Sequence, residues 1–128
     1  MRSPIFGDVK KILVFSLLLL SLSCFAPERN CEAYRTGTFT FTAEVDGEEH
    51  TTLFTRTETL ELSEYQGKTD SASVRWINDC EYILTDLSSE APKPIHMKIL
   101  STTENSYTFE YKLVGSTQTS RGTAFKTE

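Results

Sequence analysis

The sequence is poor in the residue types that usually carry chemistry. Its 128 residues include two histidines and three cysteines. Neither His50 nor His96 lies at metal-ligand spacing from a cysteine. The chain also has no glycine-rich phosphate loop, no HExxH motif and no nucleophile elbow. We therefore expect no catalytic residues, no bound metal and no cofactor, and we interpret the protein as a non-enzyme.

Positive charge is the second shortage. The chain has 13 Lys and Arg residues against 18 Asp and Glu residues, a net charge of -5 at pH 7. Proteins that bind nucleic acid need a basic surface that neutralises phosphates. The composition therefore argues against nucleic acid as a partner, and against docking on anionic lipid by charge alone.

The sequence also lacks an apolar run long enough to span a membrane. The apolar stretch near its N-terminus, residues 12–22 (ILVFSLLLLSL), has eleven residues, whereas a spanning helix needs about 20. Basic residues precede this stretch, and serines occupy the −3 and −1 positions before Cys24. This order is typical of a secretory signal peptide. We expect residues 1–23 to be removed on export, which leaves 105 residues with a net charge of −7.

The number of cysteines is odd, which in an exported protein calls for a separate role for one of them. The stretch LSLSC resembles a bacterial lipobox, although Ser21 stands where Leu or Val is usual. We expect Cys24 to carry lipid and to anchor the protein in the outer membrane, facing the periplasm or the cell surface. Simple secretion, after cleavage at Ser23 or Ala26, is the alternative.

The two other cysteines, Cys31 and Cys80, then remain as a pair. An oxidising periplasm or exterior permits a disulfide between them. It would close a loop of about 50 residues and stabilise the domain by about 4 kcal/mol on the chain-entropy model.

From Thr36 onward the sequence is typical of β-strands. Thr, Val, Ile and aromatic residues are abundant, and no stretch of ten residues shows helical periodicity. Residues 37–45 alternate between apolar and polar, and Asp46-Gly47 then predicts a two-residue hairpin. Similar segments recur every 8–12 residues or so. We predict an all-β domain over residues 36–128, preceded by a tether over residues 24–35. Its expected fold is an antiparallel up-and-down meander of seven or eight strands, closed or nearly closed into a barrel, with a β-sandwich as the alternative.

Aromatic residues dominate the expected inner face of this sheet. An eight-stranded barrel is just wide enough to be filled by side chains or to hold one small ligand. The aromatic residues expected to form the core or a ligand site are Phe39, Phe41, Trp76, Tyr82, Phe109 and Tyr111. With so many large side chains, a filled core is favoured. A cavity would need small inward residues, for which the candidates are Ala43, Ala72 and Ala124.

Charged residues also occur within the expected strands. An arginine that pointed inward would need a partner and would be a functional lead. We expect instead that Arg56, Arg75 and Arg121 point outward, opposite glutamates. The glutamates expected on the solvent face are Glu48, Glu49, Glu58, Glu61 and Glu64.

Four segments, RTGTFTFTAEVDG, TRTETLEL, SVRWINDCEYIL and RGTAFKTE, carry a resemblance to a known family. Over roughly residues 31–128 the chain resembles a family of short exported proteins of Bacteroidota, chiefly flavobacteria. The resemblance implies no activity, and no catalytic residue can be transferred from it. Members often carry the automatic name DNA topoisomerase IV, which conflicts with a short, acidic, exported chain. The strand-rich meander is also similar to lipocalin-like envelope proteins, in architecture alone.

Three functions follow as hypotheses, in decreasing order of support. The first is a non-enzymatic envelope lipoprotein that binds a protein or a small molecule. The second is a lipocalin-like carrier of one small hydrophobic ligand. The third, least favoured, is an envelope hydrolase.

Overall fold

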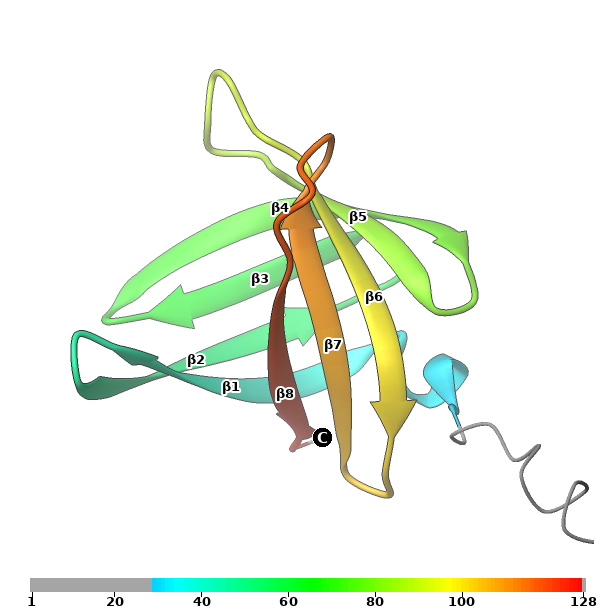
Figure 1. Ribbon diagram of the computed structural model, residues 1–128. Coiled ribbons are helices and arrows are strands. Elements are labelled where there is room, and N and C mark those ends of the chain that lie inside the picture. Colours follow the sequence, from blue (N-terminus) through cyan, green and yellow to red (C-terminus); the bar gives the residue numbers. More distant parts are fainter. Residues whose placement is uncertain (1–28, 128) are drawn as a thin grey trace, which may run out of the picture.

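Eight antiparallel strands follow one another along the chain and close into a barrel in the computed structural model, which describes residues 29–127 (Figure 1). The elements are the 3-10 helix η1 (Cys31–Tyr34) and the strands β1 (Gly37–Val45), β2 (Glu48–Arg56), β3 (Leu60–Tyr65), β4 (Lys68–Asn78), β5 (Glu81–Asp86), β6 (Ile95–Thr102), β7 (Ser106–Leu113) and β8 (Ser120–Lys126). Each strand pairs with the next, and β8 pairs with β1. The predicted up-and-down barrel is therefore confirmed, with eight strands.

The expected signal peptide, residues 1–23, and the expected lipid site, Cys24, lie outside the described residues. Within residues 29–127, no helix has the length and apolar character needed to cross a membrane.

Two tight hairpins set the register of the first four strands. Asp46 and Gly47 join β1 to β2 with φ of 53° and 81°, and Gln66 and Gly67 join β3 to β4 with φ of 49° and 77°. Two consecutive positive φ values are what a two-residue hairpin needs to match the twist of its strands. The predicted Asp46-Gly47 turn is therefore confirmed. It places Phe39 opposite Phe54 on the inner face of the sheet.

Threonine side chains cover much of the outer face. The hydroxyl oxygens of Thr42 and Thr51 lie 2.9 Å apart on neighbouring strands, and those of Thr38 and Thr55 lie 3.3 Å apart. Such cross-strand pairs stabilise a sheet and suit a half-exposed pleated surface. The threonine-rich composition thus follows from the fold.

The two ends of the barrel differ. One end carries η1 and the β2–β3, β4–β5 and β6–β7 connections, and it is here called the closed end. The other four connections surround the opposite end, away from η1 in Figure 1, which is here called the open end. The disulfide between Cys31 and Cys80 ties η1 to the β4–β5 turn, as predicted. The Tyr34 hydroxyl donates to the backbone oxygen of Thr103 at 2.6 Å. Residues 31–34 belong to the segment expected to be a tether, but they pack against the barrel, with Cys31 and Tyr34 buried.

The barrel seam is short. Strands β1 and β8 pair over only three residues each, from Phe39 with Lys126 to Phe41 with Ala124. Beyond Phe41 the ladder between them stops. The two strands leave a hollow of about 510 Å³ at this point, which is lined in part by Phe41, Tyr111 and Gly122.

Candidate functional site

The barrel interior holds a cavity of about 250 Å³, here called the cup. Its lining comes from strands β1, β2, β3, β5, β6 and β7. The lining residues are Phe41, Thr52, Phe54, Glu61, Ser63, Tyr82, Leu84, Ile95, Met97, Tyr107, Phe109 and Tyr111. Most of this surface is aromatic or aliphatic, with few polar groups, which is the usual make-up of a small-molecule site.

The interior is packed at the closed end and hollow toward the open end. Phe39 is fully buried and stacks on Phe54, with ring centroids 5.2 Å apart. Tyr34 and Tyr107 lie at the same end, with ring centroids 5.2 Å apart. The expected filled core is therefore present only in part, because aromatic rings pack the closed end and line the cup beyond it.

Arg56 lies at the base of the cup and corrects the expectation that it points outward. Its side chain has no exposed surface. All five of its N–H groups have acceptors. Nε donates to the backbone oxygen of Arg35 (3.2 Å), and Nη1 donates to Glu61 Oε1 (2.9 Å) and to the Tyr82 hydroxyl (2.7 Å). Nη2 donates to the backbone oxygen of Tyr34 (2.7 Å) and to the Tyr107 hydroxyl (3.2 Å). Arg75 and Arg121 are exposed, as expected.

Glu61 corrects a second expectation, since it is buried and ion-paired rather than on the solvent face. Strand β3 pairs with β2 so that Glu61 lies directly opposite Arg56 and Leu62 lies opposite Thr55. Side chains alternate between the faces of a strand. The register that places Glu61 inside therefore places Leu62 outside, where 43% of its surface is exposed. The glutamates at positions 48, 49, 58 and 64 are exposed, as expected.

The groups around Arg56 at the base of the cup favour its charged form. Burial lowers the pKa of Arg56, but Tyr82, Tyr107 and Glu61 outweigh it and raise the pKa above its usual range. The guanidinium carbon also lies 4.9 Å from the Phe39 ring centroid and 4.8 Å from that of Tyr82, which adds cation–π attraction. Burial raises the pKa of Glu61, and Arg56 opposes this shift. Burial also raises the pKa of Tyr82 and that of Tyr107.

Comparison of the chain with protein-family models, curated proteins and solved structures found no match.

The aromatic residues singled out in the sequence divide between the cup and the packed end. Phe41, Tyr82, Phe109 and Tyr111 line the cup. Phe39 and Trp76 do not: Phe39 is fully buried in the packed end, and Trp76 packs on Tyr82 with ring centroids 4.4 Å apart. The candidate small residues Ala43, Ala72 and Ala124 lie on the inner face of β1, β4 and β8, but none of them lines the cup.

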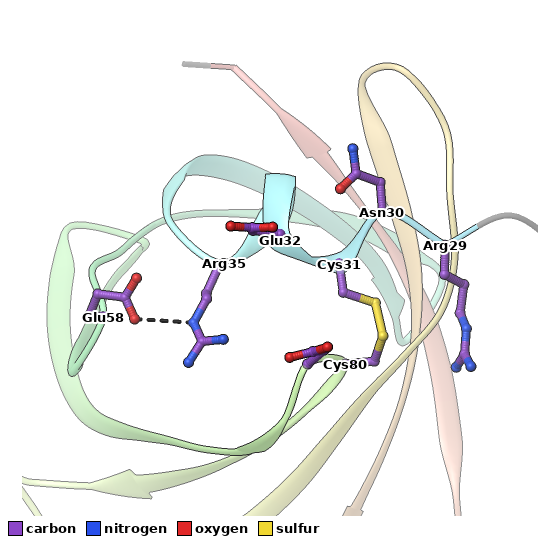
Figure 2. Close-up of a pocket in the computed structure, with 8 residues that line it drawn as sticks. Arg29, Asn30, Cys31, Glu32, Arg35, Glu58 and Cys80 are labelled. Carbon is purple, nitrogen blue, oxygen red and sulfur yellow. Dashed lines mark hydrogen bonds and ion pairs between the residues drawn. A yellow bond between two sulfur atoms is a disulfide. The ribbon is translucent and has the colours of Figure 1, made fainter.

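A larger hollow of about 540 Å³ lies outside the barrel, beside the disulfide (Figure 2). It is lined by charged side chains of both signs, and Arg35 Nε bonds Glu58 Oε2 at 3.1 Å. The guanidinium of Arg35 also lies 4.7 Å from the Trp76 ring centroid. Among residues 29–127, no group of three or more His, Cys, Asp or Glu side chains is placed to hold a metal. We take the cup as the candidate site because its lining is mainly apolar and aromatic.

The residues of the candidate site that the sequence did not predict are the charged pair, Arg56 and Glu61. A signal for them existed. Phe54 is an inner-face residue, and two steps along a strand return to the same face, so Arg56 shares that face. A glutamate five residues later, across a short connection, then lies opposite the arginine.

Proposed function

We propose that this protein is a non-enzymatic binding protein of the cell envelope, and that it holds one small, mainly apolar molecule in the cup. The observation that carries the proposal is an apolar-lined cavity of about 250 Å³ inside a closed barrel. That volume equals roughly eight molecules of liquid water. A site of this size accommodates a compact ligand, since drug-sized molecules use about 300–1,000 Å³.

Apolar residues at the open end give further support. Each of its four connections has an exposed apolar or aromatic side chain in it or beside it: Val45, Tyr65, Leu87, and Leu113 with Val114. Apolar groups at the mouth suit the entry of an apolar ligand, because the ligand keeps apolar contacts while it leaves water. This favours the carrier hypothesis over a general interaction module.

The location is part of the same proposal. Export rests on the signal-like residues 1–23, and membrane attachment rests on the lipobox-like sequence before Cys24. The Cys31–Cys80 disulfide suits an oxidising compartment. Labelling of cells with a tagged palmitate should mark the wild type and leave the Cys24→Ala variant unmarked. An unlabelled wild type would remove the lipid anchor from the proposal.

Native mass spectrometry of the protein purified from its envelope tests the carrier function. We expect a bound small molecule that dissociates on denaturation and can be identified by extraction. The variant Ser63→Phe places an aromatic ring in the cup and should lower occupancy about tenfold or more, since it displaces several ligand atoms. Thr55→Leu, on the outer face of β2, is the matched control and should bind like the wild type. The proposal is contradicted if all three proteins show equal occupancy, or if none of them carries a bound molecule.

Gly122 provides a second test from the other side of the cup. A Cβ at this position would lie 2.5 Å from Phe41 Cε2 and 2.8 Å from Phe109 Cζ. Both rings line the cup, so rings displaced by the new methyl group can move into its empty volume. Gly122→Ala should therefore fold, but it should bind the ligand of the cup about tenfold more weakly than the wild type, because displaced rings shrink the cavity. Ser120→Ala, exposed on the same strand, is the control. Unchanged affinity in a calorimetric titration of Gly122→Ala would show that these rings do not bound the site.

A further inference from the structure

The hydrogen-bonding capacity at the base of the cup is unevenly used. A buried arginine at the base of an apolar cavity suggests at first a carboxylate ligand, such as a fatty acid, because guanidinium pairs well with carboxylate. Here, however, each of the five N–H groups of Arg56 donates to an acceptor of the protein itself. Arg56 therefore has no N–H left for an incoming anion.

Glu61 is in the opposite position. Its Oε1 accepts from Arg56 at 2.9 Å, whereas within residues 29–127 no group donates to its Oε2. Among residues 29–127, Trp76 Nε1 is the one side-chain polar atom that is both fully enclosed and without a hydrogen-bond partner. Oε2 of Glu61 has no partner among these residues either, so it is not fully enclosed and keeps accessible surface. Glu61 is one of the residues that line the cup. A carboxylate oxygen at this point can accept a hydrogen bond and offers none.

The charges at the base of the cup also limit the charge that a ligand can carry. Arg56 and Glu61 are a single ion pair with side chains 0% and 10% exposed. They neutralise each other, so an ammonium ligand would bring an uncompensated positive charge into an apolar cavity. A carboxylate would bring a negative charge beside Glu61. Both costs are large when water is excluded.

We propose that the ligand of the cup is an uncharged, mainly apolar molecule with one hydrogen-bond donor, such as a hydroxyl, which it donates to Oε2 of Glu61. The inference rests on the proposed carrier function and specifies its ligand class. The apolar part of the ligand then lies among Phe41, Leu84 and Ile95, nearer the open end.

Matched nine-carbon probes test the inference by calorimetric titration of the full protein. Nonanol donates and accepts a hydrogen bond, methyl heptyl ketone only accepts, and nonanoate and nonylammonium are charged. We expect nonanol to bind about tenfold more tightly than the ketone, because the ketone leaves Glu61 without a donor. The two ions should bind more weakly still.

Two variants locate the effect. Glu61→Gln keeps the size of the side chain and an oxygen for Arg56, and it presents an N–H to the cup. We expect the tenfold preference for nonanol over the ketone to disappear in this variant. Glu58→Gln, at an exposed carboxylate outside the cup, should keep it. A thermal melt monitored by circular dichroism verifies that Glu61→Gln is folded before titration.

The outcomes separate the two proposals. If none of the four probes binds, the carrier function itself is contradicted. If the ketone binds as tightly as nonanol, a hydroxyl of Ser63 or a tyrosine serves as donor, and the inference about Glu61 is overturned while the carrier function stands. Tightest binding of nonanoate or nonylammonium overturns the inference in the same way. A preference for nonanol that survives in Glu61→Gln also overturns it.

Discussion

Replacement of Arg56 by alanine should lower the free energy of unfolding by about 3–5 kcal/mol, the usual cost of removing one partner from a buried ion pair. The variant leaves Glu61 buried without its cation and takes the donors away from two backbone oxygens of the η1 segment. It also removes a side chain that contacts the Phe39 and Tyr82 rings. Urea denaturation at neutral pH, followed by circular dichroism, measures the change.

Two further variants identify the cause. Arg121→Ala removes an exposed arginine, whose Nη2 lies 3.8 Å from Glu110, and should change stability by about 0.5 kcal/mol or less. In the double variant Arg56→Met with Glu61→Met, no unpaired charge is left inside, so it should be clearly more stable than Arg56→Ala. If Arg56→Ala unfolds at the same urea concentration as the wild type, the buried pair does not organise the closed end.

Loss of the disulfide should lower the free energy of unfolding by about 4 kcal/mol on the chain-entropy model. The bond joins Cys31 to Cys80 across a sequence separation of 49 residues, so its removal frees a long loop in the unfolded chain. Urea denaturation of the wild type, with and without reductant, measures the effect. The double variant Cys31→Ser with Cys80→Ser should match the reduced protein. Equal midpoints in the two conditions would contradict a stabilising role.

The disulfide and Arg56 should also be coupled, because both hold η1 against the closed end. The bond fixes Cys31, while the guanidinium binds the backbone oxygens of Tyr34 and Arg35. Groups that share one structural element have non-additive effects on stability. Reduction should therefore cost less in Arg56→Ala than in the wild type. Amide hydrogen exchange over residues 31–35 should accelerate in each single change, which reports directly on the helix.

The elements that could be predicted depend on short stretches of sequence. Alternation along β1 identifies a strand with one apolar face, and Asp46-Gly47 identifies its turn, because both signals are complete within a few residues. The antiparallel meander then follows from short connections between successive strands. The pairing of Cys31 with Cys80 needed only the assignment of Cys24 to another role.

The cup and its charged base depend on contacts between distant strands. A lone arginine or glutamate in a strand is usually exposed, so composition alone places Arg56 and Glu61 outside. Only the pairing of β2 with β3 brings them face to face, and only the closed barrel supplies Tyr82 and Tyr107 as further partners. The cost of burying each charge is offset by groups that the local sequence does not contain.

Local sequence thus determined that the chain forms an antiparallel all-β domain with one disulfide, since alternation, turns and cysteine number act over short range or by simple counting. Tertiary structure alone decided that part of the interior is a cavity. A cavity is the space left between rings such as Phe41 and Phe109, and that space depends on where every neighbouring strand places its side chains.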